Sequence, residues 1–216
     1  MLIPSAQVTS SSAVQVLLLI GGATLIPAML FTVTGFSRIL IVLGFIRTAM
    51  GTQNSPPNQV LVGIALFLTL FVMAPTIGQI KTVAWDPLEH KQISTAQAIE
   101  RAEQPLREFM FRQTGDSELS LFVSMAHIKV PQTEGEVPTY VLIPAFIMSE
   151  VKTAFQIGFL IFLPFLIIDL IVSSTLMSMG MIMLPPTFIS LPFKILLFVL
   201  VDGWDLIVRS LVLSFH

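Results

Sequence analysis

The chain has 216 residues, of which 54% are hydrophobic and only 11% are charged, and its formal net charge is -2. A soluble globular domain carries about 25% charged residues, so this composition favours a membrane protein over an ordinary soluble one. Because the chain has no excess of basic residues, it is not expected to bind nucleic acid. It has no cysteine and therefore forms no disulfide. Its three histidines (His90, His127 and His216) are scattered and predict neither a metal site nor a bound cofactor.

The charged residues divide the chain into three parts. Residues 81–136 contain 15 of the 24 charged side chains, and the remaining nine are scattered over the two apolar parts on either side. We therefore expect N-terminal membrane and assembly helices over residues 1–80 and a polar insert over residues 81–138. A second apolar part, a C-terminal helical hairpin, is expected over residues 139–216.

A helix needs about 20 apolar residues to cross the hydrocarbon core of a bilayer. Four segments reach this length, at residues 13–36, 58–80, 140–163 and 189–213. The first has too long an apolar core, and no basic residue before it, for a signal peptide, so we expect it to be retained. The chain is therefore predicted to be an all-α membrane protein with four long apolar helical segments, kinked or folded into hairpins.

Residues 38–47 form a shorter apolar stretch with Arg38 and Arg47 at its ends. It is too short to cross a bilayer, so we expect it to lie at the membrane interface or against another subunit. The short loop over residues 37–57 carries these two arginines and no acidic residue, which favours a cytoplasmic position. The insert, with six basic and nine acidic residues, is then expected on the extracytoplasmic side together with both termini.

The insert itself has the sequence features of a helical hairpin. Ser94 and Gln97 form a capping-box pattern at the start of a first helix, and Pro105 is expected to interrupt that helix. Gly115 is expected to end the first helix, and Asp116 is expected to cap a second one. We predict an α-helical hairpin that lies outside the bilayer.

Ionisable residues interrupt the C-terminal apolar part, namely Glu150, Lys152, Asp169, Lys194, Asp202, Asp205 and Arg209. Each would cost roughly 2.5–3.5 kcal/mol at the centre of a bilayer, so each is expected to face protein, water or the interface. Glu150 and Lys152 are two positions apart and point to different sides of a helix, so each needs another partner. We favour buried polar pairing, between subunits or within a helix, and a proton or ion pathway is the alternative.

Prolines cluster in the same part of the chain, at Pro144, Pro164, Pro185, Pro186 and Pro192. A proline inside a helix removes one backbone hydrogen bond and kinks or ends the helix. Non-helical backbone at membrane depth is tolerated only inside protein or beside a cavity. A simple kink would explain one proline, but five favour helix breaks around a central passage, with Pro164, Pro185 and Pro186 near the pore.

Residues 177–186 contain the alternate methionines Met177, Met179, Met181 and Met183, followed by two prolines. Because methionine is unbranched and polarisable, it packs against changing surfaces with little strain. Methionine more often fills gaps in a core, but four of the chain's eleven methionines occur within seven residues of one expected loop. We therefore predict that this loop is a soft gasket that closes a pore.

Two long stretches, residues 144–158 (PAFIMSEVKTAFQIG) and 164–169 (PFLIID), resemble the signature of the FliP/SctR family of type III secretion export-gate proteins. Shorter stretches that resemble the same family are at residues 36–39 (FSRI), 47–61 (RTAMGTQNSPPNQVL), 105–110 (PLREFM), 189–194 (ISLPFK) and 201–204 (VDGW). Val151 stands where the family usually has leucine, and the basic signal peptide common in the family is missing.

This resemblance implies a role in flagellar protein export rather than catalysis. Members of the family form a pentameric ring that joins FliQ, FliR and FlhB-like subunits in the bacterial inner membrane, at the flagellar basal body, and unfolded flagellar proteins pass through it. By resemblance, the loop around Met181 and Met183 is the gate, Glu150 and Lys152 make contacts between subunits, and the insert lies in the periplasm. The family also folds its helices back as hairpins, above the plane that hydropathy predicts.

A small-ion or solute channel is the alternative function, indicated by Asp169 and Glu150 near membrane depth. An intramembrane enzyme is disfavoured, because the chain has no His-Glu-x-x-His motif, no Gly-x-Ser-x-Gly motif and no paired aspartates placed for hydrolysis. The chain is therefore predicted to be a structural and gating subunit without a reaction or a cofactor of its own.

Overall fold

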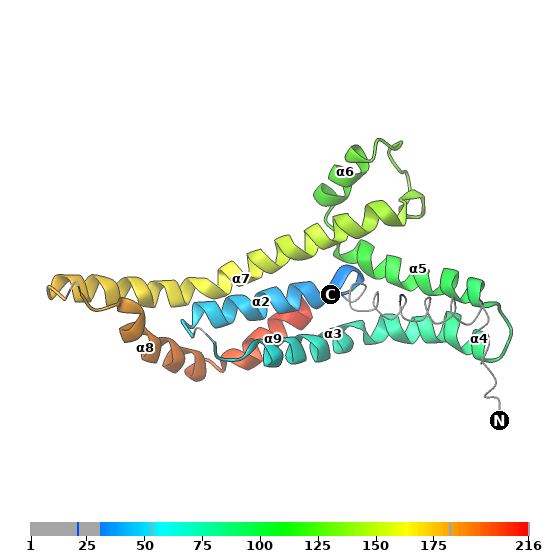
Figure 1. Cartoon of the computed structure of the whole chain (residues 1–216). Coiled ribbons are helices and arrows are strands. Elements are labelled where there is room, and N and C mark those ends of the chain that lie inside the picture. The colour runs from blue at the N-terminus through cyan, green and yellow to red at the C-terminus, as the bar shows by residue number, and fades with distance from the viewer. Residues whose placement is uncertain (1–20, 22–30, 53, 182, 216) are drawn as a thin grey trace, which may run out of the picture.

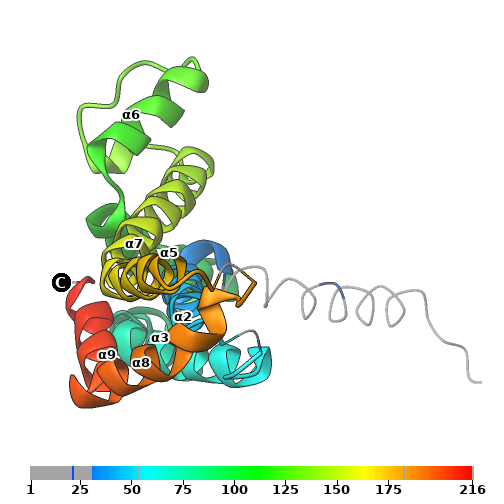
Figure 2. The ribbon, with the colours of Figure 1, turned by 90° about the vertical axis from the view of Figure 1, so that its left-hand side faces the viewer.

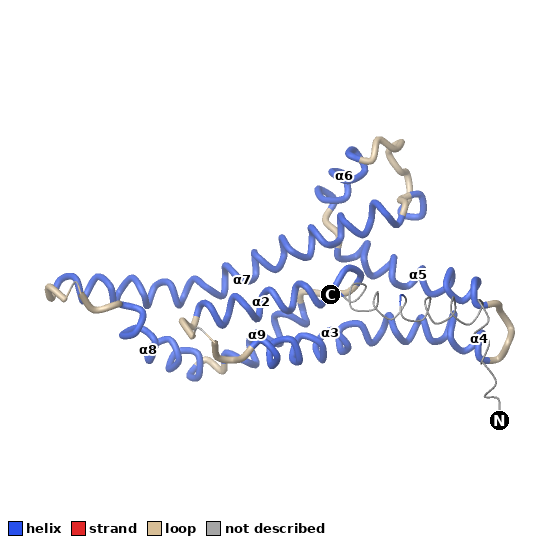
Figure 3. Tube along the Cα trace, in the orientation of Figure 1, coloured by secondary structure: helices blue, strands red, loops and turns tan. Residues whose placement is uncertain are grey.

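The computed structural model describes Gly21 and residues 31–52, 54–181 and 183–215, and every regular element in these ranges is a helix. The prediction of an all-α protein is confirmed for the described residues. The helices are α2 (Phe36–Ala49), α3 (Asn58–Ile80), η1 (Lys81–Trp85), α4 (Asp86–Glu89), α5 (Thr95–Gln113), α6 (Asp116–Met125), η2 (Glu134–Glu136), α7 (Thr139–Ser178), α8 (Pro186–Leu200) and α9 (Gly203–Leu213). Figure 3 shows the loops that connect them.

The longest helix, α7, organises the rest of the molecule. It has 40 residues, so at a rise of 1.5 Å per residue it is about 60 Å long. It contacts α2, α5, α6 and α8 along its length, and α6 projects from the body of the molecule (Figure 1). Helix α8 folds back at the far end of α7, and α9 then returns towards the centre of the molecule.

Three prolines that were expected to break or kink helices lie inside continuous ones. Helix α7 runs through Pro144 and Pro164, and α5 runs through Pro105. The predicted helix breaks at Pro164 and Pro105 are therefore wrong. A proline removes only one backbone hydrogen bond, and the remaining bonds on either side of each proline keep α7 helical while α2 and α8 pack against it.

Helix α2 lies in the hydrophobic core. Its residues Ile39, Val42, Leu43 and Ile46 are buried and follow the i, i+3, i+4, i+7 spacing of one helix face. This helix packs against α7 and α3 of its own chain. The prediction that residues 38–47 lie at the interface or against another subunit is therefore wrong, because their apolar face is covered within the chain.

The close approach of α2 to α7 depends on a glycine. A Cβ atom built on Gly158 of α7 would lie 2.5 Å from the ring of Phe45 on α2, a distance that no real side chain tolerates. The ring of Phe45 also contacts the ring of Phe155 edge-on, with 5.1 Å between the ring centres. Gly158 therefore leaves the room that the Phe45 ring occupies where α2 packs against α7.

Two helices among the described residues are long and apolar enough to cross a membrane, judged by length and composition. One is α7, and the other is the continuous helix Asn58–Glu89, which comprises α3, η1 and α4. The boundaries predicted for residues 58–80 are those of α3. Most of the predicted first segment, residues 13–36, lies outside the described residues.

The predicted fourth segment, residues 189–213, is not one helix. It is divided into α8 and α9 by Asp202, whose φ of 50° is left-handed. The Asp202 N–H donates to the carbonyl of Val199 at 3.2 Å, and the Asp202 carbonyl accepts from Leu206 at 3.2 Å. Aspartate tolerates this conformation better than most residues, so the chain turns here within an otherwise apolar run.

The insert begins as the sequence indicates, but its two helices do not form a self-contained hairpin. Ser94 and Gln97 form the predicted capping box, with bonds of 3.3 Å and 2.9 Å between side chain and backbone. The N-cap of α6 is Gly115, so the predicted cap at Asp116 is one residue too late. Helix α5 packs on α3, η1 and α7, whereas α6 packs on α7.

Candidate functional site

The methionine loop begins where α7 ends. Gly180 has a φ of 75°, its N–H donates to the carbonyl of Met177 at 3.0 Å, and the N–H of Met181 donates to the carbonyl of Leu176 at 2.9 Å. This pair of bonds is a Schellman motif, which ends a helix on a left-handed residue, usually glycine. The loop ends at Pro185 and Pro186, the N-cap and first residue of α8, which is where the sequence predicts a break.

The four methionines of this loop are exposed rather than packed in a core. Met183 is 97% exposed, and Met177, Met179 and Met181 are also exposed. The loop lies at one end of the molecule, in the view of Figure 2 at the side that faces the reader. Such a surface offers flexible apolar contacts without directional bonds. The core-filling alternative for these methionines is therefore wrong for the conformation described.

A buried polar cluster joins the two helices that flank the loop. The Lys194 Nζ of α8 donates to Asp169 Oδ2 of α7 at 2.6 Å, and Ser190 Oγ donates to Asp169 Oδ1 at 2.6 Å. Lys194 and Ser190 are buried and Asp169 is partly buried. Asp169 and Lys194, two of the residues predicted to be buried polar ones, thus pair with each other across α7 and α8, and we name Asp169, Ser190 and Lys194 the hairpin clamp.

The third residue predicted to be a buried polar one, Asp202, is exposed. Its place between α8 and α9, at the outside of a turn, leaves its carboxylate in contact with the surroundings. The prediction of burial is therefore wrong. An aspartate inside an apolar run marks a turn here, not an internal pair.

Glu150 pairs with Arg38 at the centre of the molecule. The Arg38 Nη2 donates to Glu150 Oε1, and the two side chains are 2% and 0% exposed. The prediction that Glu150 needs a partner on another element is confirmed, and the partner comes from α2. A carboxylate without exposed surface contacts nothing beyond its own chain, so the prediction of an intersubunit contact is corrected for Glu150.

Lys152 pairs with the insert. Its Nζ donates to Glu118 Oε1 of α6 at 2.6 Å, and one helix turn earlier the Gly115 N–H donates to Ser149 Oγ at 2.7 Å. The hydrogen bond from Lys152 holds the pKa of Glu118 below its usual value of 4.5, although burial acts in the opposite direction. Half of the Lys152 side chain remains exposed, and its intersubunit role stays a prediction.

Three residues of these contacts were not predicted from the sequence to be partners: Arg38, Glu118 and Ser190. Arg38 was used only as an indicator of the membrane side, yet it borders an apolar run just as Glu150 lies within one. That placement alone could have identified it as a buried partner. Glu118 and Ser190 carry no such signal, since each lies in a local sequence that also contains other polar residues.

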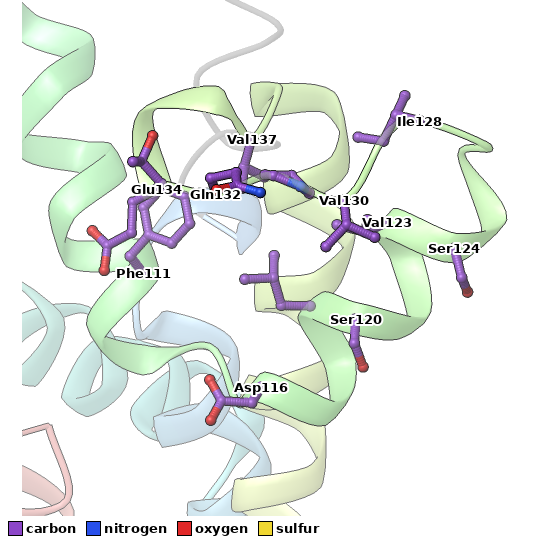
Figure 4. A pocket seen from close by; sticks show the side chains of 13 residues that line it. Phe111, Asp116, Ser120, Val123, Ser124, Ile128, Val130, Gln132, Glu134 and Val137 are labelled. Carbon is purple, nitrogen blue, oxygen red and sulfur yellow. The ribbon is translucent and has the colours of Figure 1, made fainter.

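The insert contains a cavity of about 380 Å³ between α6 and the segment that leads to α7 (Figure 4). Its walls are largely apolar, with Asp116 and Glu134 at its edge. Arg107 of α5 holds the segment in place, because its guanidinium donates to the carbonyls of Glu134 at 3.1 Å and Val137 at 2.7 Å. Within the described ranges, no three histidine, aspartate or glutamate side chains gather in a way that could hold a metal ion.

Comparisons with known proteins identify the family of this chain. A family model described as the FliP family matches residues 19–211. The flagellar biosynthetic protein FliP of Bacillus subtilis is 55% identical over 205 residues, which cover 95% of this chain and 93% of the relative. The proteins of the same name from Pectobacterium carotovorum and Treponema pallidum are 54% and 52% identical and match 94% of this chain, or 79% and 76% of their own lengths. The chain belongs to the FliP family of flagellar biosynthetic proteins.

Proposed function

We propose that this protein is a structural and gating subunit of the flagellar type III protein-export channel. The observation that carries the proposal is the methionine loop, which is exposed between two helices that the hairpin clamp holds together. In the proposed assembly, several copies form a ring, pentameric by resemblance, in which these loops meet. FliQ, FliR and FlhB-like subunits complete the channel, and unfolded flagellar proteins are its substrates.

The proposed location is the bacterial inner membrane at the flagellar basal body, with the insert on the periplasmic side. The two helices long and apolar enough to span a membrane support a membrane location. The names of the relatives support a role in building the flagellum. The side on which the insert lies rests on Arg47, in the last turn of α2, and on the absence of acidic residues from residues 39–57, which together favour the cytoplasm for that end of the helix.

The proposed gate works by packing rather than by bonding. Methionine side chains adapt to one another and to passing side chains with little strain, because their chains are unbranched and their sulfur is polarisable. A ring of exposed thioethers would exclude water and ions when it is closed, and would yield to a polypeptide without breaking hydrogen bonds. Gly180 and the two prolines limit the loop to a short segment with well-defined ends.

Deleting residues 179–183 tests this function. We expect the variant to assemble and to make the membrane permeable to small ions, measured as ion flux into vesicles that contain the purified export complex. Met125→Ser is the matched control, because it removes an exposed methionine of α6, far from the loop. Unchanged ion permeability in the deletion would contradict the gate, and ion conductance in the intact, substrate-free complex would favour a small-ion channel instead.

A further inference from the structure

Residues 211–215 comprise the last residues of α9 and the two residues after it. They lie beside Arg38 of α2, although 176 positions separate Arg38 from Ser214. Figure 1 shows this end of the chain near the start of α2 and the end of α5. Leu211 and Phe215 are buried. The segment therefore meets α2 and α5 at the site where Arg38 pairs with Glu150.

Hydrogen bonds tie the backbone of this segment to two buried or partly buried side chains. The Arg38 Nη1 donates to the Ser214 carbonyl at 2.7 Å and to Ser214 Oγ at 3.2 Å. The Gln113 Nε2 of α5 donates to the Phe215 carbonyl at 3.0 Å, and Gln113 Oε1 accepts from Arg38 Nη2 at 3.0 Å. These carbonyls come after α9 has ended, where backbone acceptors have no partner within the helix.

The ring of Phe215 fits a slot made by the same helices. The Arg38 guanidinium carbon lies 4.0 Å from the centre of the ring, close enough for a cation–π contact. Phe109 of α5 stacks on the ring with 6.4 Å between centres. A Cβ atom built on Gly35 would lie 2.4 Å from the ring, so only glycine leaves room for it there.

We propose that Arg38 is the positioning residue that locks residues 211–215, and with them the end of α9, onto α2 and α5. A buried guanidinium needs its donors satisfied, and Glu150 and Gln113 accept only from Nη2. The Ser214 carbonyl and hydroxyl are the acceptors for Nη1. The lock therefore works in both directions: Arg38 orders the segment, and the segment supplies the acceptors for Nη1, whereas the buried Nε has no partner among the described residues.

The lock fixes the end of α9, the second of the two helices that follow the methionine loop. Helix α8 is held near the loop by the hairpin clamp, and α9 is held at its end by Arg38. Movement of the loop is then separated from movement of α9. This inference concerns the docking of α9 alone and does not depend on what passes through the channel.

Hydrogen exchange of the full-length protein in detergent tests the lock with the double variant Arg38→Met and Glu150→Met. Replacing a buried ion pair by apolar side chains of similar volume is often neutral for stability, so α2 and α7 are expected to stay packed. We expect the amides of Ser214 and Phe215 to exchange about tenfold to a hundredfold faster, because a charged hydrogen bond and a cation–π contact are lost. Amides of α2 and of the first turns of α7 should change little.

Two further variants make the result decisive if the double variant does not fold. Gln113→Leu keeps the Arg38–Glu150 pair but removes the donor to the Phe215 carbonyl, and should give a smaller increase at the same two amides. Asp205→Asn together with Arg209→Gln removes the exposed pair of α9 and should leave them unchanged. Unaltered exchange at Ser214 and Phe215 in the folded double variant, or in Gln113→Leu, would overturn the lock.

Discussion

The centre of the molecule and its methionine end differ in how their side chains are exposed and bonded. At the centre, Arg38 and Glu150 are charged side chains with almost no exposed surface, and each is held by directional bonds from other helices. At the far end, Met183 and its neighbours are apolar side chains that are exposed and make no such bonds in the described part of the chain.

This contrast shows how the chain separates rigidity from adaptability. Directional bonds between buried charges fix the relative positions of helices, because any displacement leaves a charge unpaired at low dielectric. Exposed methionines impose no such geometry. The region that we propose to change shape is therefore the region in which change costs least.

The largest expected effect comes from breaking the central pair on one side. Glu150→Leu leaves the Arg38 guanidinium buried without its carboxylate, and loss of one partner of a buried pair costs about 3–5 kcal/mol of unfolding free energy. Thermal and denaturant unfolding in detergent measure this loss. Adding Arg38→Met to the variant should recover most of the stability, and failure to recover it would show that packing, not charge, dominates at the centre.

The crossing of α2 and α7 gives the next largest effect. Gly158→Ala places a methyl group against the Phe45 ring, and overpacking of this kind costs about 1–3 kcal/mol. The control is Gly44→Ala on α2, where nothing lies within 4 Å of the added atom, so higher helix propensity should leave stability equal or raised. Equal unfolding midpoints for the two variants would mean that α2 and α7 accommodate the added methyl group at Gly158 without loss of stability.

The contact between α6 and α7 should depend on pH. Because the pKa of Glu118 in the folded protein is below 4.5, the contribution of its pair with Lys152 is complete above that pH and is lost as the pH falls through the lowered pKa. Protease cleavage within residues 114–127 should therefore accelerate only as the pH falls below 4.5. Glu118→Gln should cleave at the faster rate at neutral pH as well; an acid-dependent rate that survives this substitution would point to another group.

The smallest expected effect is at the methionine end. Met183→Gln changes a side chain that is 97% exposed, so the free energy of unfolding should stay within about 0.5 kcal/mol of the original. The same denaturant titration measures it. A loss greater than 1 kcal/mol would mean that Met183 is packed in solution, and the contrast between the two regions would no longer hold.

Much of the local structure could be predicted from the sequence because its causes are local. The capping box at Ser94 and the start of α3 after Pro57 each depend on residues within a few positions of one another. The end of α7 was not predicted in this way, because the helix runs to Ser178, beyond the predicted boundary at residue 163. The family could also be identified from contiguous stretches, such as residues 144–158, and the match over residues 19–211 agrees with it.

The continuity of the helices and the environment of the charged side chains could not be predicted from local sequence in the same way. Pro164 interrupts a helix in isolation, but α2 and α8 pack along α7 and keep it continuous. Asp202 looks like a buried ion inside an apolar run, but it lies at a turn, where a left-handed backbone places it outside. In both cases the outcome depends on what lies next to the residue in space.

That this chain is helical and apolar, that it belongs to the FliP family and that its charges inside apolar runs need partners can all be inferred from the amino-acid sequence. These properties follow from composition, spacing and the high cost of an unpaired charge in an apolar environment. The identity of the partners is set by the packing of the helices: Arg38 pairs with Glu150, Glu118 with Lys152, and Asp169 with Lys194. The reason is physical, since a buried charge can be paired by any opposite charge within reach, and reach is set by how the helices pack.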